Sequence, residues 1–133
     1  YKNALPVMRE RGLVATMFVI SGVADGDAAA AELLSLPVMP TAVFAMSDEL
    51  AVGVLRTLRR AGVAVPGQVS VVGFDDHDSA AVAELTTVAQ PVRRQGELAA
   101  RALLAALDGE HPGDVEVPTR LVVRATTAPP RVS

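Results

Sequence analysis

The fold is decided by residues 42–62, which read AVFAMSDELAVGVLRTLRRAG. The first five residues are apolar without polar alternation, which predicts a short strand covered on both faces. Ser47 and Asp48 follow as candidate helix caps, because their side-chain oxygens can accept hydrogen bonds from the free N–H groups of a first turn. From residue 50 the apolar residues recur at helical spacing, and Gly62 can take the left-handed conformation that ends a helix. Strand, cap and helix thus follow one another in this one stretch.

The same alternation extends on both sides. Residues 14–20 are rich in β-branched side chains and predict an earlier strand, and residues 27–36 predict a helix capped by Asp27. Downstream, residues 69–74 predict a third buried strand that ends in the acidic run 75–78. This spacing is typical of right-handed βαβ crossovers. The predicted fold class is therefore α/β, with a three-layer parallel sheet that carries helices on both faces.

The pattern changes after the third strand. Residues 86–89 predict a brief strand, and residues 92–108 predict a helix that ends at Gly109. Apolar side chains cover almost the whole circumference of that helix, which in a globular protein indicates burial on more than one side. Residues 120–124 predict an edge strand.

Composition bounds the function. The chain of 133 residues is 50% hydrophobic and 20% charged, so a single folded domain is expected. The absence of cysteine excludes disulfide scaffolds, thiolate zinc sites and cysteine nucleophiles. A net charge of −3 makes this chain a poor candidate for direct contact with nucleic acid. No membrane span is expected, because the longest apolar stretch is shorter than the roughly 20 residues that cross a bilayer.

The polar residues that could bind a ligand follow the predicted strands. Parallel sheets bind ligands outside the carboxyl ends of their strands, where the connecting loops converge. Ser21 follows the first strand, Ser47 and Asp48 follow the second, and residues 75–78 follow the third. Four of these residues are carboxylates, which favour a sugar, a nucleoside or a cation over an anion. The carboxylates are Asp48, Asp75, Asp76 and Asp78.

Other kinds of site fit less well. Ser47 and Asp48 can act simply as caps, with or without a ligand. A metal site is not expected, because consecutive acids point in different directions and no metal-ligand spacing occurs. The sequence also lacks the nucleophile-elbow, P-loop and dinucleotide signatures, and neither His77 nor His111 has a triad partner at a recognisable spacing. Neither an enzyme nor a cofactor is therefore expected.

Three ordered motifs resemble the lactose-repressor (LacI/GalR) family of bacterial transcription regulators. The first is PTAVFAMSDELAVG at residues 40–53. The second is RAGVAVP at 60–66, leading into SVVGFDD at 70–76, and the third is LTTVAQP at 85–91. The resemblance runs over residues 1–127 and covers the carboxyl-terminal part of the family's effector-binding core.

The resemblance implies a type I periplasmic-binding-protein-like fold, in which two α/β lobes hold the effector between them. Residues 1–89 would form the second lobe. Residues 90–110 would form the crossing segment and a helix that packs on a first lobe outside this chain. Residues 111–133 would return to the second lobe as the terminal strand and tail.

The family's site residues carry over by position. Asp75 resembles the effector-contacting aspartate, whose carboxylate can accept from two vicinal hydroxyls. Ser47 lies where many members have an effector-contacting Asn, Gln90 lies near the lobe crossing, and Ser21 lies where several members place an aromatic ring. The resemblance also implies a homodimer. Its interface is predicted to include Val54, Leu58, Ala80 and Val82.

The predicted function is effector sensing in a LacI-family regulator, with a sugar-like or nucleoside-like effector. Operator DNA would be bound only through a helix-turn-helix outside this chain, and the protein would be cytoplasmic. The alternative is an exported sugar-binding protein of the same fold, which the sequence upstream of residue 1 would distinguish.

Overall fold

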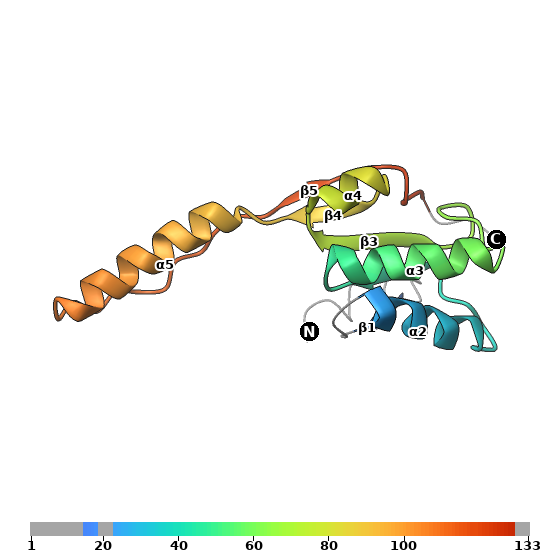
Figure 1. The fold of residues 1–133 in the computed structure, drawn as a ribbon, viewed down its shortest axis with the longest axis horizontal. Helices are drawn as coiled ribbons and strands as arrows, with labels where there is room; N and C mark the ends of the chain where they lie inside the picture. The colour runs from blue at the N-terminus through green and yellow to red at the C-terminus, as the bar shows by residue number, and fades with distance from the viewer. Residues whose placement is uncertain (1–14, 19–22, 130–133) are drawn as a thin grey trace.

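One five-stranded sheet organises the computed structural model, which describes residues 15–18 and 23–129 (Figure 1). Helices pack beside the sheet, and one further helix extends away from this body (Figure 1). The elements in chain order are β1 (Ala15–Phe18), α2 (Val23–Leu34), β2 (Ala42–Ala45), α3 (Asp48–Arg60), β3 (Ser70–Asp75), α4 (Asp78–Val82), β4 (Thr86–Ala89), α5 (Val92–Leu107) and β5 (Arg120–Val122).

The strands lie in the order β1-β2-β3-β4-β5. Strands β1 to β4 pair in parallel, which confirms the predicted βαβ arrangement. Strand β5 was predicted as an edge strand and takes that place, but it pairs antiparallel to β4, with Val88 opposite Leu121. The sheet is mixed because the chain leaves β4 along α5 and must come back in the opposite direction.

The core lies between the helices and one face of the sheet. In β2 and β3, Val43, Ala45, Val71 and Gly73 are buried, whereas the alternate residues are half-buried. Helices α2, α3 and α4 share a single core cluster with this buried face. No described helix packs on the other face, where the rings of Phe44 and Phe74 meet edge to face at 6.4 Å. A second helical layer therefore does not appear within residues 15–18 and 23–129.

The ends of α3 confirm the sequence reading of residues 42–62. Ser47 accepts a hydrogen bond from the Leu50 N–H at 3.3 Å and caps the helix. Gly62 has the left-handed φ of 74° that was expected where the helix ends. The prediction for Asp27 is wrong, because α2 already begins at Val23.

Asp27 instead joins two helices. Its carboxylate forms an ion pair with Arg56 and accepts from the Thr57 hydroxyl at 2.7 Å. Both partners lie on α3, so the side chain fastens α2 to α3 rather than its own first turn.

Three of the four residues predicted for a dimer interface belong to the core. Leu58 and Ala80 are 0% exposed and Val54 is 2% exposed, all within the chain's own apolar cluster. Val54 and Leu58 enter this cluster from α3 and Ala80 enters it from α4, so none of the three side chains is available to a partner. Val82 is 87% exposed, and its role at an interface stays a prediction.

Helix α5 contacts little of the described chain. It extends from the body, and residues 111–119 run back beside it toward β5 (Figure 1). No residue of α5 is buried, so the described residues do not supply the burial predicted from its apolar circumference. Leu107, for example, is 75% exposed. None of the described helices is long and apolar enough to cross a membrane.

Candidate functional site

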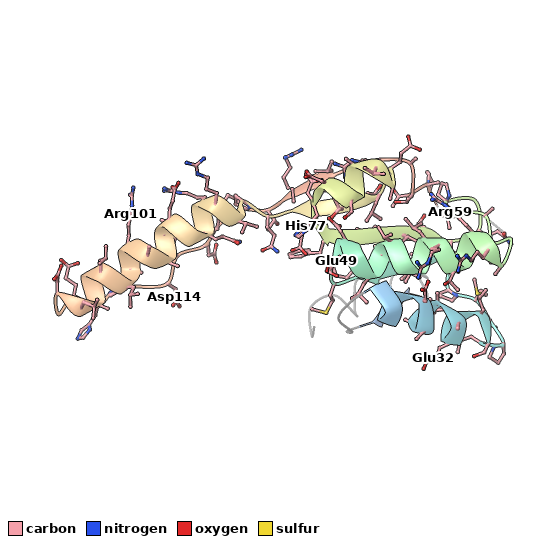
Figure 2. The ribbon with its side chains drawn as sticks, in the orientation of Figure 1. Glu32, Glu49, Arg59, His77, Arg101 and Asp114 are labelled. Atoms are coloured by element: carbon pink, nitrogen blue, oxygen red, sulfur yellow. The ribbon has the colours of Figure 1, made fainter. Side chains whose placement is uncertain are left out.

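The carboxyl ends of β3 and β4 form the candidate site. The two strands end in register, with Asp75 opposite Ala89. The chain then turns into α4 after β3 and crosses to α5 after β4. Figure 2 shows His77 and Glu49 close to each other at this end of the body, on the side from which α5 departs.

A pocket of about 390 Å³ opens at this crossing. Its walls come from the ends of β3 and β4 and from the segment that returns into β5. The lining residues are Asp75, Asp76, Ala89, Gln90, Pro91, Pro118 and Arg120. Two of the four predicted effector contacts, Asp75 and Gln90, are thus brought into one pocket.

Asp75 and Gln90 contact each other directly. The Gln90 Nε2 donates to Asp75 Oδ1 at 2.5 Å, and both residues are half-buried. The same Gln90 accepts through Oε1 from Gln95 Nε2 at 3.2 Å. Because Gln95 lies in the first turns of α5, this short relay connects the end of β3 with the helix beyond the crossing.

The backbone at the end of β3 takes an uncommon path. Asp75 and Asp76 have φ values of 113° and 60°, which lie in a backbone region that residues other than glycine rarely adopt. Conformations of this kind cost about 1–3 kcal/mol each and persist where surrounding contacts hold them. The sharp turn separates the two acids: Asp76 forms an ion pair with Arg124 at 2.7 Å, whereas Asp75 bonds to Gln90.

Arg124 makes Asp76 a structural residue. Its second guanidinium nitrogen donates to the Leu85 carbonyl at 2.8 Å. The ion pair is about three-quarters buried, with side-chain exposures of 22% for Arg124 and 23% for Asp76. Of the two consecutive acids Asp75 and Asp76, Asp75 is therefore the one placed to bind a ligand.

The remaining predicted residues have different positions. Ser47 caps α3 and does not line the pocket, so its contact with an effector stays a prediction. Asp48 is 1% exposed and also stays outside the pocket. Ser21 lies outside the described residues. Across residues 15–18 and 23–129, no three His, Cys, Asp or Glu side chains gather closely enough to hold a metal ion.

Sequence reasoning missed the contribution of the returning segment. Pro118 and Arg120 line the pocket although they lie far along the chain from Asp75. Residues 120–124 were recognisable as a strand, but no local signal states that this strand pairs with β4. That pairing sets Arg120 opposite Ala89 and so adds a residue with several N–H donors to the lining that contains the carboxylates.

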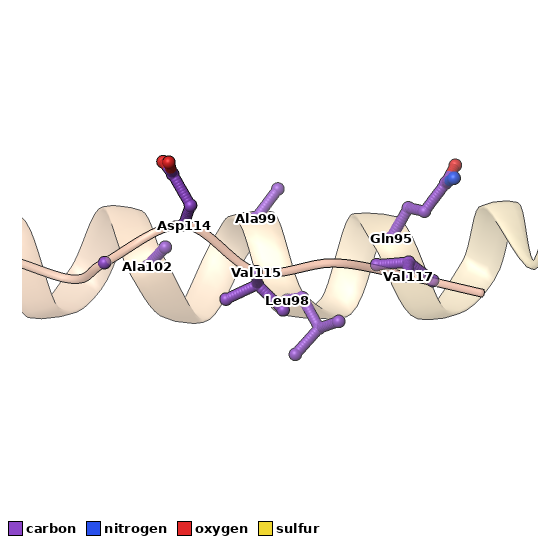
Figure 3. Close-up of a pocket in the computed structure, with 8 residues that line it drawn as sticks. Gln95, Leu98, Ala99, Ala102, Asp114, Val115 and Val117 are labelled. Atoms are coloured by element: carbon purple, nitrogen blue, oxygen red, sulfur yellow. The ribbon is translucent and has the colours of Figure 1, made fainter. Parts of the chain in front are cut away.

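A second hollow lies along α5. It measures about 470 Å³ and is lined by α5 and by the returning residues 113–117, which run along the helix in Figure 3. Leu98, Val115 and Val117 give it an apolar lining, with Gln95 and Asp114 at its polar edge. It has no cluster of convergent polar groups, so the pocket at Asp75 is the better candidate for a specific ligand.

Comparison with known proteins agrees with this geometry. The family model described as "Periplasmic binding protein-like domain" matches residues 2–127. The chain belongs to this family. The periplasmic-binding-protein-like fold predicted from the sequence is thereby confirmed.

Relatives within this periplasmic binding protein-like family are transcription regulators. The lactose operon repressor of Rhizobium radiobacter is 35% identical over 107 residues, which cover 78% of this chain and 95% of that protein. The HTH-type transcriptional repressor CytR of Escherichia coli (strain K12) is 39% identical over 106 residues, covering 77% of this chain and 31% of CytR. The chain thus spans about a third of the length of CytR.

A solved structure extends the likeness to a sugar complex. The LacI family transcriptional regulator from Enterococcus faecium with bound ribose has a TM-score of 0.70 and 35% identity, covering 83% of this chain and 42% of that one. The resemblance to the LacI family is confirmed. This periplasmic binding protein-like chain corresponds to the effector-binding part of LacI-family regulators.

Proposed function

We propose that this chain senses a small, sugar-like effector within a DNA-binding transcription regulator. The observation that carries the proposal is the pocket at the crossing, where Asp75 and Gln90 meet beside Arg120. A ligand rich in hydroxyl groups suits this set of donors and acceptors. The ribose complex of a protein 35% identical to this one supports a sugar as the effector.

Each side chain would have its own task. The Asp75 carboxylate can accept hydrogen bonds from two hydroxyls, and hydrogen bonds to a charged group are about twice as strong as neutral ones. The Gln90 amide can both donate and accept, and the Arg120 guanidinium can donate to ring or hydroxyl oxygens. Asp75 would exchange its bond with Gln90 for bonds with the ligand.

The position of the pocket suits a sensor. It lies where β4 gives way to α5, and both Gln90 and Arg120 belong to segments that pass through this crossing. The segments before and after the crossing can be arranged in more than one way relative to each other. A ligand that binds one of these arrangements better than another would shift the population toward it. Such a shift can alter DNA affinity at a distant site if that site also differs between the two arrangements.

DNA contact would occur elsewhere in the protein. The net charge of −3 makes this chain a poor candidate for contact with a phosphate backbone, and the relative CytR is named as HTH-type. These two observations support operator binding through a helix-turn-helix in a longer protein, and the regulator names of the relatives support a cytoplasmic location. The regulator would be a non-enzymatic homodimer, with the exposed Val82 as one interface residue. The relatives' names favour this regulator over an exported binding protein.

Asp75→Asn is expected to weaken sugar binding. The amide accepts hydrogen bonds through one oxygen only and carries no charge, so a ligand hydroxyl loses a strong partner. The expected loss is about 1–3 kcal/mol, or roughly 5- to 150-fold in affinity. Isothermal titration of the full-length regulator, which contains both lobes, with D-ribose, sucrose and cellobiose measures it.

Asp78→Asn is the matched control. Asp78 is an exposed acid of the same loop, it begins α4, and it does not line the pocket. We expect this variant to bind as the unmodified chain does. Equal affinity of the Asp75→Asn variant and the unmodified full-length regulator would remove Asp75 from the site, and no binding of any of the three sugars to that regulator would count against a sugar effector.

The exposure of α5 supports a two-lobe organisation of a longer protein. Residues 1–89 and 111–133 would form one lobe, and residues 90–110 would cross to pack α5 against the other. The support is the exposure of three leucines near the end of the helix, which no described residue covers. They are Leu103, Leu104 and Leu107, and each is more than 60% exposed.

The 133-residue chain is expected to associate through α5 in a concentration-dependent way. Burying one leucine side chain contributes about 1.5–3 kcal/mol, so three exposed leucines favour contact between copies. Light scattering over a range of protein concentrations measures this. The triple variant Leu103→Gln, Leu104→Gln and Leu107→Gln should be monomeric over the same range. A chain that stays monomeric at the highest concentration without these changes would refute the expectation.

A further inference from the structure

Asp48 is a buried carboxylate that touches neither the pocket nor solvent. It lies in the first turn of α3 and is 1% exposed. A buried charged group requires hydrogen-bond partners, and both of its oxygens have one. The Thr87 hydroxyl donates to Oδ1 at 2.5 Å, and the His77 backbone N–H donates to Oδ2 at 2.8 Å.

The two donors belong to the two chain segments that carry the pocket. His77 lies in the turn that follows Asp75, and Thr87 lies in β4, the strand that leads to Gln90. One carboxylate from a third element, α3, therefore connects the end of β3 with β4. Neither connection belongs to the ladder of the sheet, so Asp48 adds a constraint that strand pairing alone does not supply.

The carboxylate has little freedom to move. A side chain at Gly73 of β3 would collide with Asp48 Oδ1, and its Cβ would also lie 2.8 Å from Leu85 Cδ2 and 3.3 Å from Ala51 Cβ. Glycine at this position leaves the space that Asp48 fills over the strand. Because the surrounding atoms are close-packed, the carboxylate cannot turn away without losing both bonds.

The turn after β3 depends on outside contacts. Asp75 and Asp76 both hold positive φ values, and such conformations persist only when neighbouring structure fixes them. His77 caps α4 without any side-chain hydrogen bond to that helix. The bond from its N–H to Asp48 is thus a contact from another helix that fixes the turn immediately after the two strained residues.

We propose that Asp48 is a positioning residue for the effector pocket. By binding His77 and Thr87 together, it sets the distance and orientation at which Asp75 and Gln90 meet. Its importance for sensing rests on the proposed function, whereas its effect on the Asp75–Gln90 contact exists without ligand and is measurable without it.

The test replaces Thr87 in the full chain and observes Gln90. Thr87→Val keeps the shape of the side chain but leaves Asp48 Oδ1 without its donor. The side-chain amide of Gln90, followed by NMR in ¹⁵N-glutamine-labelled protein, should lose the shift caused by its bond to Asp75. The hydrogen of the His77 backbone amide should exchange with solvent at least about tenfold faster. Its bond to the charged Asp48 carboxylate is weakened, and a loss of this size in a bond to a charged group corresponds to about that factor. Thr87→Ser, which restores the hydroxyl, should restore both signals.

Thr86→Val is the matched control. Thr86 is the preceding residue of β4 and is also buried, but its hydroxyl contacts Thr127 and the Arg124 N–H on the other side of the strand. This variant should lower stability and leave the Gln90 and His77 signals unchanged. Unchanged signals in Thr87→Val, or equal changes in both valine variants, would overturn the positioning role.

Asp48→Asn provides an independent second variant, and D-ribose separates the two proposals. The amide cannot accept at both positions, so the same two signals should change in this variant. If ribose fails to bind the full-length regulator while the signals change as stated, the sugar assignment fails and the positioning role is supported. If ribose binds and the signals do not respond to either substitution, the positioning role alone fails.

Discussion

Replacing Leu58 with alanine should lower the free energy of unfolding by about 2–5 kcal/mol. Leu58 is 0% exposed and packs in the cluster that α3 forms with the sheet and α2. Removing most of the side chain loses the free energy gained by transferring those atoms from water into the core. It also leaves a cavity that the close-packed neighbours fill only in part. Urea denaturation followed by circular dichroism measures the loss.

The same experiment separates a core residue from an interface residue. If Leu58 belongs to the chain's own core, the loss of stability is independent of protein concentration, whereas a lost subunit contact makes it concentration-dependent. Val38→Ala, between α2 and β2, is the matched control, because that valine is 74% exposed and its truncation should change stability by less than about 0.5 kcal/mol. A loss for Leu58→Ala as small as for Val38→Ala would contradict the core packing.

Gly26→Ala should lower stability by about 1–3 kcal/mol or more, although it adds a single methyl group. Gly26 lies where α2 approaches the backbone of α3 closely. A Cβ there would collide with the Leu50 carbonyl oxygen and lie 3.1 Å from the Gly53 Cα. These are backbone atoms, so the helices must separate to admit the methyl group. The separation would open the core and strain the ion pair of Asp27 with Arg56. Thermal and urea unfolding measure the effect.

Gly96→Ala is the control, because its expected effect on stability has the opposite sign. It lies inside α5, and nothing lies within 4 Å of a Cβ placed there. Alanine favours a helix over glycine by about 0.5–1 kcal/mol, so this variant should not lower stability. Equal stability of the Gly26→Ala variant and the unmodified chain would show that α2 and α3 do not approach as closely as described.

The elements of the body were predictable because their signals are local. The apolar runs at 42–46 and 69–74, the cap at Ser47 and the glycine at 62 each depend on a few neighbouring residues, and all four agree with the structure. Asp27 shows the limit of this reasoning. It has the residue type of a cap, but its carboxylate is used by Arg56 and Thr57, which lie on another helix.

The interface prediction conflicts with the burial of Val54, Leu58 and Ala80 for a similar reason. Periodicity identifies the apolar face of α3 but does not say which element covers it. Val54 and Leu58 could have faced a second subunit as well as the chain's own sheet, and only packing assigned them to the core. The opposite difference occurs at α5. Its apolar surface was predicted to be buried, but it is exposed within the described residues.

The candidate site could likewise be predicted from the sequence only in part. Asp75 and Gln90 could be proposed from their places at strand ends and from the family resemblance, because parallel strands end at one edge. Their direct contact, the diversion of Asp76 to Arg124 and the arrival of Arg120 could not be predicted, since each joins segments far apart in the chain.

The sequence by itself determined the alternation of strands and helices, the parallel order that right-handed crossovers impose, and the family. These properties follow from side-chain period, caps and motifs, which are set by residues close together in the chain. Only the tertiary structure decided that β5 runs antiparallel, that Leu58 is core, and that Asp48 binds His77 and Thr87. These depend on which distant surfaces pack together, and that choice is made by shape and by the need to pair buried polar groups, which no local pattern encodes.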